Sequence, residues 1–408
     1  MHTEEYGLSY TINRRAADLC PGNAAIWHNI GKCYHEKQQE EKAEEYFKKA
    51  LKLNPSFYNS LEGLAMCSVN RGRFGEAIAY ANRALAEDPE ALEAKLNRGI
   101  AYLALKRWRE GWRDYNYNIG IDKNRKELTY GKESRWDGTK GLDVVCYGEQ
   151  GIGDEISFAS CLPDLIRDSK SVTIECDGRL ERLFQRSFPM TKVYGTRYKE
   201  NRPWKSDKTF DARVPLGQLP YFYRKKDEDF SGNPYLIPNP QMRLQWKALL
   251  ESLGTKPKIG IAWTGGIPKT GQKRRTVGLD TFGPLFNAID AEWVSLQYKD
   301  TDGIKGAEEK YGVKIHDWHW GNRDWDYDQT VALISELDLV ISVCTSVVHV
   351  AGGLGKECWC LVPHFPMWRY LNEGDWFPWA KSVKLFRQKG NEWPIDVLLA
   401  KLKDKVNA

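Results

Sequence analysis

The pattern of apolar and polar residues changes near residue 137. Before that point, apolar and small residues recur every three to four positions, the spacing of amphipathic helices. After the turn-rich stretch 137–141, short apolar runs alternate with helical patterns. Such alternation is typical of parallel sheets flanked by helices. The sequence therefore predicts a helical N-terminal region followed by an α/β region.

The helical region repeats with a period of about 34 residues, the length of a tetratricopeptide repeat. Small residues occupy the points where paired helices cross, and proline marks the turn to the next pair. The residues that carry the first two copies are Trp27, Gly31, Tyr34, Ala43, Phe47, Ala50, Pro55, Leu61, Leu64, Ala65, Ala77, Ala81, Ala84 and Pro89. A third copy begins at Lys95 and degenerates through Gly111, and Pro21 matches the end of an earlier copy whose first helix is missing.

We expect these repeats to form an α-solenoid over residues 1–125. Two uses of the solenoid remain open from the sequence. Its helices could serve as a cap for the region that follows, or its concave face could hold a peptide or protein partner. We favour a partner by analogy with other solenoids.

The α/β region divides into two series of strands and helices. The proline-rich stretch 234–240 separates them and has the composition of a linker. We predict lobes over residues 126–238 and 239–408, with a cleft between their strand ends. The predicted strands cover residues 142–147, 171–176, 192–194, 258–263, 292–297, 313–316, 338–343, 357–362 and 383–386. The predicted helices cover residues 153–167, 180–188, 242–252, 281–287, 328–336 and 347–354, with a short helix within the connection 213–223 and a last helix from Pro394.

Composition narrows the class of protein. A length of 408 residues suggests two or three domains, and a net charge of +5 is too small to indicate nucleic-acid binding. No apolar run is long enough to span a bilayer, and the first residues lack an export signal, so we expect a soluble, cytoplasmic protein. Most of the nine cysteines lie in apolar patterns, as reduced core residues do.

The first lobe carries a glycine-rich loop, GEQGIGD, directly after its first strand. Gly151 and Gly153 let the backbone turn tightly, and Asp154 projects from the first helical turn toward the predicted cleft. A carboxylate in that place could accept a proton from a hydroxyl. Two other interpretations remain open. Asp154 could merely complement the helix dipole, or the loop could be a weak dinucleotide fingerprint with Glu175 on a ribose, although its spacing is GxxGxG.

The second lobe carries the stretch LDLVISVCTSVVHVAGGLG, which reads as a strand, a polar turn and a small-residue helix that ends at Gly355. Thr345 and Ser346 open the helix, so unpaired N–H groups, two hydroxyls and the positive end of the dipole converge there. This arrangement suits a phosphate. The alternative is an ordinary N-cap that binds nothing.

Several motifs together resemble glycosyltransferase family 9, the heptosyltransferase family, and more distantly the O-linked N-acetylglucosamine transferases. They are YGEQGIGDEISFASCLPDL, GIAWTGG with Arg275, SLQY, LDLVISVCTSVVHVAGGLGK, WRY, WFPWA and LFRQ. The resemblance implies a GT-B fold of two Rossmann-like lobes, with the acceptor on the first lobe and a nucleotide-sugar on the second. It implies inverting, metal-independent transfer of a hexosyl or heptosyl group from a nucleotide-diphosphate-sugar to a hydroxyl of a protein or glycan. Asp154 matches the proposed general base.

The same resemblance implies a set of donor-binding residues in the second lobe. They are Thr264, Gly265 and Gly266 near the phosphates, Lys273 and Arg275 against the diphosphate, Gln297 near the nucleoside, Thr345 and Ser346 at the helix start, and His349 one turn further on. No cofactor is expected besides the nucleotide-sugar substrate. His316 and His319 lack a third ligand, so no metal is expected either.

One position departs from the pattern of this family. Most relatives have aspartate where this chain has Cys344, and that carboxylate is thought to position the donor sugar. A thiol cannot accept two hydrogen bonds as a carboxylate does. The departure keeps an alternative function open, in which a catalytically impaired nucleotide-binding scaffold uses its repeats for protein interaction. A dehydrogenase is a third and weaker alternative.

Overall fold

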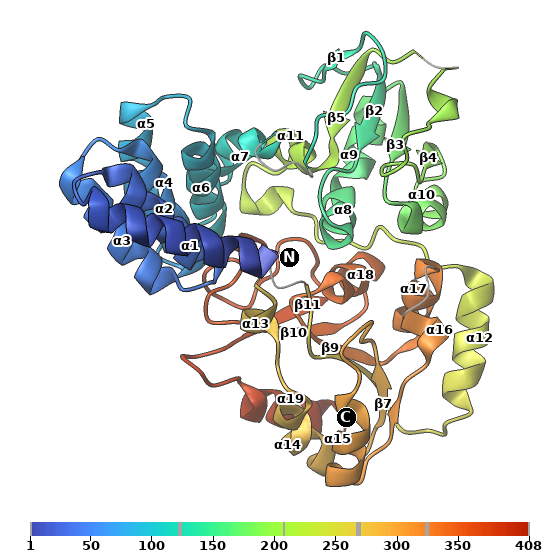
Figure 1. Cartoon of the computed structure of the whole chain (residues 1–408). Helices are drawn as coiled ribbons and strands as arrows, with labels where there is room; N and C mark the ends of the chain where they lie inside the picture. The colour runs from blue at the N-terminus through green and yellow to red at the C-terminus, as the bar shows by residue number, and fades with distance from the viewer. Residues whose placement is uncertain (1, 121–124, 207–208, 267–270, 323–325, 407–408) are drawn as a thin grey trace. The chain divides into compact units, whose positions relative to one another are not determined.

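The computed structural model describes residues 2–120, 125–206, 209–266, 271–322 and 326–406 (Figure 1). Contacts between Cα atoms divide the chain into two compact units. The repeat unit comprises residues 1–125 and 365–373, and the α/β unit comprises residues 126–364 and 374–408. The predicted fold class, helical repeats followed by an α/β region with two parallel sheets, is confirmed.

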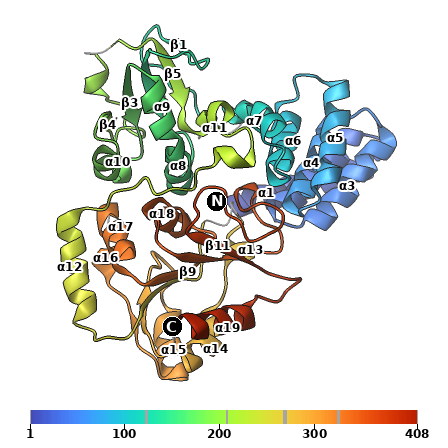
Figure 2. The ribbon, with the colours of Figure 1, turned by 180° about the vertical axis from the view of Figure 1, so that it is seen from behind.

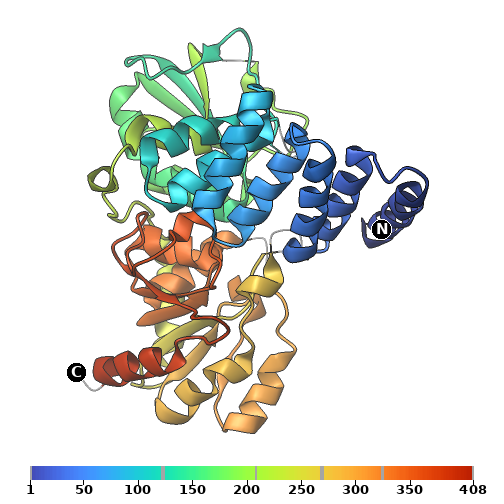
Figure 3. The ribbon, with the colours of Figure 1, turned by 90° about the vertical axis from the view of Figure 1, so that its left-hand side faces the viewer.

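The repeat unit consists of consecutive helices that pack in pairs (Figure 3). Its helices are α1 (His2–Leu19), α2 (Ala24–Glu36), α3 (Glu40–Leu53), α4 (Tyr58–Asn70), α5 (Phe74–Glu87), α6 (Leu92–Ala104) and α7 (Trp108–Tyr115). Gly31 shows why small residues recur: a Cβ atom there would lie 2.7 Å from the ring of Phe47, which is fully buried. The helices therefore approach closely at the predicted crossing points.

A distant segment completes the last repeat. Residues 365–373, predicted as part of the second lobe, pack within the repeat unit. The ring of Trp368 meets Trp112 and Tyr115 edge to face, with centroids 5.4 and 5.3 Å apart. The backbone N–H of Asn372 donates to the carbonyl of Ala104 at 3.2 Å. Residues 365–373 thus cover the apolar face of α6 and α7 within the repeat unit.

The first sheet of the α/β unit has the strand order β1-β5-β2-β3-β4, and all of its neighbours are parallel. The strands are β1 (Ser134–Arg135), β2 (Asp143–Tyr147), β3 (Ser171–Glu175), β4 (Lys192–Tyr194) and β5 (Ala212–Pro215). Two differ from the prediction. The structure places β5 next to the central strand β2, in a stretch expected to be a connection, and adds the short edge strand β1.

The helices of the first lobe follow the prediction with one break. They are α8 (Ile152–Phe158), α9 (Leu162–Asp168), α10 (Glu181–Ser187) and α11 (Leu219–Tyr223). A single helix was expected over 153–167, but a 3-10 turn (Ala159–Cys161) divides it. Pro163 explains the division, because it occupies the first turn of α9 and has no N–H to continue the preceding helix.

The second sheet has the order β11-β10-β9-β6-β7-β8, again with parallel neighbours. Its strands are β6 (Lys258–Ala262), β7 (Glu292–Ser295), β8 (Ile315–His316), β9 (Leu339–Val343), β10 (Cys358–Val362) and β11 (Val383–Arg387). Its helices are α12 (Pro240–Glu251), α13 (Gln272–Arg275), α14 (Gly283–Ala288), α15 (Gly303–Tyr311), α16 (His319–Asn322), α17 (Tyr327–Glu336), α18 (Ser346–Leu354) and α19 (Ile395–Val406). The helices α13, α15 and α16 were not predicted.

The core of the second lobe lies between its sheet and the helices α14, α15 and α19. Ile259, Ile261 and Leu361 from the strands pack there with Phe282, Leu398 and other buried side chains. Among the described residues, no helix combines the length and the apolar character that a membrane crossing requires. The predicted absence of a membrane span is confirmed for that part of the chain.

Two features connect the lobes of the α/β unit. In the linker, the Tyr235 hydroxyl donates to the Ile156 carbonyl at 2.6 Å, and its backbone N–H donates to the Gly353 carbonyl at 2.8 Å. Arg186 on α10 donates to both carboxylate oxygens of the buried Asp328 on α17, at 2.5 and 3.2 Å. The linker and this ion pair therefore join the two lobes.

Candidate functional site

The glycine-rich loop of the first lobe is fixed by a buried ion pair. Glu155, one residue after Asp154, bonds to the Arg197 guanidinium and accepts the backbone N–H of Asp177 at 3.0 Å. Arg197 also donates to the carbonyl of Gln150 inside the loop. Burial raises the pKa of Glu155 to about 7, while the charge of Arg197 opposes that rise. Two loops far apart in sequence are thereby joined beneath the predicted base.

Asp154 lies half-buried in the first turn of α8. Its carboxylate accepts the backbone N–H of Gly151 at 3.2 Å, which closes a capping arrangement at the start of the helix. This bond holds the side chain at the loop that precedes α8. The position fits both interpretations made from the sequence, because a carboxylate that caps a helix also remains close to the loop that it caps.

The start of α18 meets the glycine-rich loop of the other lobe. A Cβ atom on Gly153 would lie 3.3 Å from Ser346 Cα and 3.4 Å from His349 Cδ2. The helices α8 and α18 pack against each other, as both sides of the molecule show (Figure 1, Figure 2). A Cβ atom at this position would therefore be in tight contact with α18 and would require its neighbours to shift by a few tenths of an ångström. The structure therefore brings Gly153, Ser346 and His349 together.

Thr345 caps α18 as the sequence predicted. Its hydroxyl accepts the N–H of Val347 at 3.2 Å, and Gly355 ends the helix with a φ of 73°. The loop 264–266 lies against this cap, because a Cβ atom on Gly265 would lie 2.1 Å from Thr345 Cγ2. The two strand-to-helix turns after β6 and β9 thus form one continuous surface.

Gln297 braces that surface from below. Its side-chain oxygen accepts the N–H groups of Trp263 and Thr264, each at 3.1 Å, and its amide donates to the Thr264 carbonyl at 3.0 Å. The residue is 1% exposed. The structure places Gln297 under the loop that the resemblance assigns to the donor, with its amide bonded to the backbone.

The basic residues of α13 occupy two different environments. Arg275 is buried, and its Nη1 donates to the carbonyl of Cys344 at 3.2 Å, immediately before the cap of α18. Lys273 is exposed and lines a cavity with Thr264. Lys299, which the sequence analysis missed, donates to the carbonyl of Gly266 at 2.6 Å. Lys299 follows shortly after β7, and this position could have indicated it, because residues after parallel strands gather at the carboxyl edge of the sheet.

A cavity lies at the carboxyl edge of each sheet. The cavity of the second lobe measures about 480 Å³ and is lined by Trp263, Thr264, Gln272, Lys273, Thr276 and Asp300, among others. The cavity of the first lobe measures about 390 Å³ and is lined by Asp177, Gly178, Arg179, Gly195, Tyr198 and Lys199. Neither Arg179 nor Asp300 was predicted from the sequence. Both follow a strand, which is the position where ligand-binding residues gather in parallel sheets.

The charges of the first cavity are largely compensated within the protein. Arg179 donates to both carboxylate oxygens of Asp177, at 2.9 and 2.7 Å. Burial works to raise the pKa of Asp177, yet the bonds from Arg179 bring it below its ordinary value. Tyr198 is 69% exposed, and its ring covers the Arg197 guanidinium at 4.6 Å. The cavity thus offers an exposed aromatic ring and polar groups.

Cys344 points into the protein. It is 1% exposed, and its Sγ lies 3.9 Å from the Sγ of Cys360 and 3.7 Å from the carbonyl of Leu361 on β10. His349 is also buried, and its ring packs 5.8 Å from that of Phe377. The Cys344 side chain is therefore directed toward the neighbouring strand β10.

Comparison with known proteins identifies the repeats and gives neighbours for the whole chain. Residues 24–57 and 68–110 match tetratricopeptide repeat families. Protein FlbA of Caulobacter vibrioides is 27% identical over 393 residues, which cover 92% of this chain and 66% of FlbA. The chain therefore spans just under two thirds of the length of this curated relative.

Two solved structures are among those to which this chain is similar. A glycosyltransferase of family 9 from Veillonella parvula is 12% identical, with a TM-score of 0.49 over 66% of this chain and 98% of its own. A mutant O-GlcNAc transferase from Thermobaculum terrenum is 13% identical, with a TM-score of 0.35 over 99% of this chain and 89% of its own. Both families named from the sequence are thus among the structural neighbours. The N-terminal helices are tetratricopeptide repeats, and an α/β region of two parallel sheets follows them.

Proposed function

We propose that this protein transfers a sugar from a nucleotide-diphosphate-sugar to a hydroxyl group of a protein or glycan. The contact of Gly153 with Ser346 carries the proposal, because it joins a loop with a half-buried carboxylate to a helix start suited to phosphate. The two groups that such a transfer needs, a proton acceptor and a site for the departing diphosphate, then belong to one site.

The donor is assigned to the second lobe. The first turn of α18, with Thr345 and Ser346, offers backbone N–H groups to the diphosphate, and Arg275 and Lys273 add positive charge. The cavity of about 480 Å³ beside Thr264 has room for the nucleoside. Gln297 supports this site by keeping the Thr264 backbone in place.

The acceptor is assigned to the first lobe, in the cavity beside Arg179 and Tyr198. Asp154 takes the proton of the acceptor hydroxyl while its oxygen attacks the anomeric carbon and the diphosphate leaves with the electron pair. A single displacement of this kind inverts the anomeric centre. The positive charge that stabilises the leaving group comes from Arg275, Lys273 and the helix start.

Nucleotide binding gives the direct test. Calorimetry with a panel of nucleoside diphosphates should give binding for at least one base, and mass spectrometry of the purified protein should identify the sugar that it retains. Lys273→Ala should weaken that binding several-fold, whereas Lys314→Ala, an exposed lysine paired with Glu308, should leave it unchanged. Absence of binding to every diphosphate would reject the proposal.

The scaffold function is the second candidate, and the buried Cys344 favours it. The side chain faces Cys360, so this position contributes no polar group to the donor side. A scaffold would bind the nucleotide but neither transfer nor hydrolyse the sugar. Measurement of sugar release from the bound donor separates the two functions.

We also propose that the repeats bind a peptide or protein. A cavity of about 120 Å³ opens among α2, α4 and α6, lined by His28, Lys32, Asn59, Glu62 and Met66, among others. These side chains offer both charges and apolar surface to an extended segment. Pull-down with Lys32→Glu, compared with Lys48→Glu on α3, tests whether this face captures the partner.

A further inference from the structure

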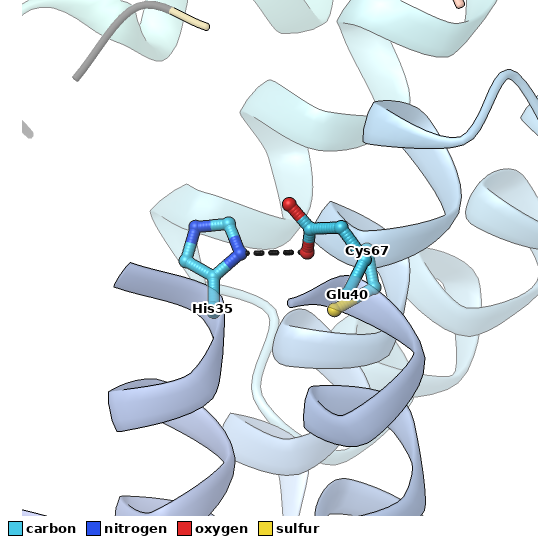
Figure 4. A group of neighbouring side chains, drawn as sticks. All are labelled: His35, Glu40 and Cys67. Carbon is cyan, nitrogen blue, oxygen red and sulfur yellow. Dashed lines mark hydrogen bonds and ion pairs between the residues drawn. The ribbon is translucent and has the colours of Figure 1, made fainter. Parts of the chain in front are cut away.

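Three side chains with metal-binding atoms meet inside the repeat unit. His35 comes from the last turn of α2, Glu40 is the first residue of α3, and Cys67 lies in α4. One nitrogen, oxygen or sulfur atom of each lies within 4.8 Å of the others. Figure 4 shows the imidazole and the carboxylate in contact, with the thiol of Cys67 beside Glu40. No function discussed above uses this group.

We propose that His35, Glu40 and Cys67 bind a zinc ion. Imidazole nitrogen, carboxylate oxygen and thiolate sulfur are the ligand types that zinc prefers, and the thiol disfavours calcium and magnesium. The ligand atoms around a tetrahedral zinc ion are separated by roughly 3–4 Å, given metal–ligand bonds of about 2.0–2.3 Å. Small side-chain rotations therefore suffice to bring the three atoms onto one ion.

The carboxylate is already oriented. His35 Nδ1 lies 2.9 Å from Glu40 Oε2, and the side-chain amide of Asn70 donates to Glu40 Oε1 at 3.0 Å. When zinc replaces the contact between His35 and Glu40, the bond from Asn70 continues to hold the other carboxylate oxygen. Bonds to the outer side of a ligand of this kind fix its direction toward a metal.

The charges of the three ligands match the charge of a zinc ion in this buried site. Cys67 is fully buried and Glu40 is 7% exposed, so an ion there must be neutralised by its ligands. One zinc ion, one thiolate, one carboxylate and a neutral imidazole sum to zero charge. Thiolate ligands bind zinc after the loss of their proton. Zinc takes the place of that proton, which passes to solvent.

The site has an access route and an open position. His35 is the most exposed of the three, with 20% of its side chain accessible, so the ion can enter beside the imidazole. Three protein ligands leave the fourth tetrahedral position to water, as in zinc sites that are not purely structural. The bound ion would link the helices of the first repeat to α4 of the next. We therefore expect zinc to stabilise the repeats.

Cobalt substitution in the full chain tests the site. After treatment with a chelator, titration with Co²⁺ should produce the near-ultraviolet thiolate-to-cobalt absorption at one ion per chain, and Zn²⁺ should abolish it. Zn²⁺ should also raise the Tm. Cys67→Ser should lose the absorption, and His35→Ala should lose at least tenfold in Co²⁺ affinity. Cys33→Ser, a buried thiol on the same helix as His35, should behave as wild type.

Two results would overturn the proposal. One is a wild-type chain without thiolate-to-cobalt absorption. The other is an absorption that survives in Cys67→Ser, which would assign the cobalt-binding thiolate to another cysteine. Loss of the absorption in Cys360→Ser would then place the cobalt at the buried pair Cys344 and Cys360. The Tm of each metal-free variant shows that it is folded, and His35→Ala keeps the test valid if the buried Cys67 does not tolerate substitution.

Discussion

The two sheets of the α/β unit end in loops that are held by different chemistry. At the first sheet, carboxylates and guanidinium groups meet in buried pairs, such as Glu155 with Arg197 and Asp177 with Arg179. At the second sheet, the loop after β6 is held by the neutral amide of Gln297, and α18 is capped by the hydroxyl of Thr345. The same topology therefore carries two kinds of support.

The difference indicates which ligand suits each edge. Ion pairs fix a loop firmly, but their charges are already satisfied by one another, so the first edge suits an uncharged ligand such as a hydroxyl-bearing acceptor. At the second edge the supports of the loop and of the helix are neutral, so the positive end of the α18 dipole and the exposed Lys273 can act on a ligand. The second edge therefore suits an anion. Substitutions at each edge test this contrast.

The largest effect is expected at Asp154, where the two edges cooperate. Asp154→Asn should reduce transfer by about 10²- to 10⁴-fold, the usual contribution of a general base, without changing the affinity for the donor. Steady-state transfer and calorimetry measure the two quantities. Glu228→Gln, an exposed carboxylate of the first lobe, is the matched control. Unchanged transfer in Asp154→Asn would assign the base to another group.

Arg197→Ala tests the support of the first edge. Removing one partner leaves the Glu155 carboxylate buried without its cation, which costs about 3–5 kcal/mol of unfolding free energy. Urea denaturation measures the loss. The double variant Arg197→Leu with Glu155→Leu should recover part of it, because neither charge of this pair then remains buried, although the Asp177 N–H loses its acceptor. A loss below about 1 kcal/mol would show that the pair behaves like a surface ion pair.

Cys344→Asp tests whether a carboxylate at this position raises transfer. The structure predicts no gain in transfer, because the side chain faces Cys360 and the Leu361 carbonyl. A carboxylate in that buried position should cost about 3 kcal/mol of unfolding free energy. Cys344→Ala, which adds no charge, should cost less. Faster transfer by Cys344→Asp would mean that the side chain can turn toward the donor.

Gln297→Ala tests the support of the second edge. It leaves two backbone N–H groups and one carbonyl without the amide, and we expect a loss of about 2 kcal/mol, smaller than that of Arg197→Ala. Gln297→Glu keeps acceptors for the N–H groups but loses the donor to Thr264 and buries a charge, so its loss should be at least as large as that of Gln297→Ala when its carboxyl is ionised. Denaturation with and without nucleotide measures both.

The smallest expected effect is a pH dependence of stability that Glu62 gives to the repeats. Burial, together with the charge of Glu93, raises the pKa of Glu62 to about 7. The folded state therefore keeps a proton that the unfolded chain releases near its ordinary pKa of 4.5. This contribution to stability is complete below that pKa and is lost as the pH rises through about 7. Glu62→Gln should flatten the decline in the Tm between pH 5 and pH 8, whereas Glu87→Gln should not.

The sequence was sufficient for the elements with strong periodicity and insufficient for short or polar ones. Strands such as 142–147 and the helix at 347–354 have continuous apolar runs and clear ends. The strand β5 was not predicted because its sequence, ARVP, is short and contains arginine and proline. The helix α15 was not predicted because its sequence, GIKGAEEKY, has two glycines and buries only Ile304 and Ala307. Neither segment carries enough apolar surface for its pattern to be recognised.

The loops of the candidate site could be predicted from the sequence, but the side-chain contacts that hold these loops could not. Strand-to-helix turns meet at the carboxyl edge of a parallel sheet, so Gly153 and Thr345 could be placed by local pattern. Gly265 was placed only through the family resemblance. The partner of Glu155 is 42 residues away, and the sulfur that faces Cys344 is 16 residues away. Contacts of that kind depend on the packing of whole elements, which a single sequence does not specify.

The packing of residues 365–373 in the repeat unit has a consequence for synthesis on the ribosome. Arg369 bonds to the hydroxyl of Tyr115 across 254 residues of sequence. At a translation rate of about 5–20 residues per second, the last repeat waits roughly 10–50 s for the segment that covers it. Throughout that interval Trp112 and Tyr115 remain exposed on the nascent chain. The final repeat therefore stays incomplete on the nascent chain until residues 365–373 have been made.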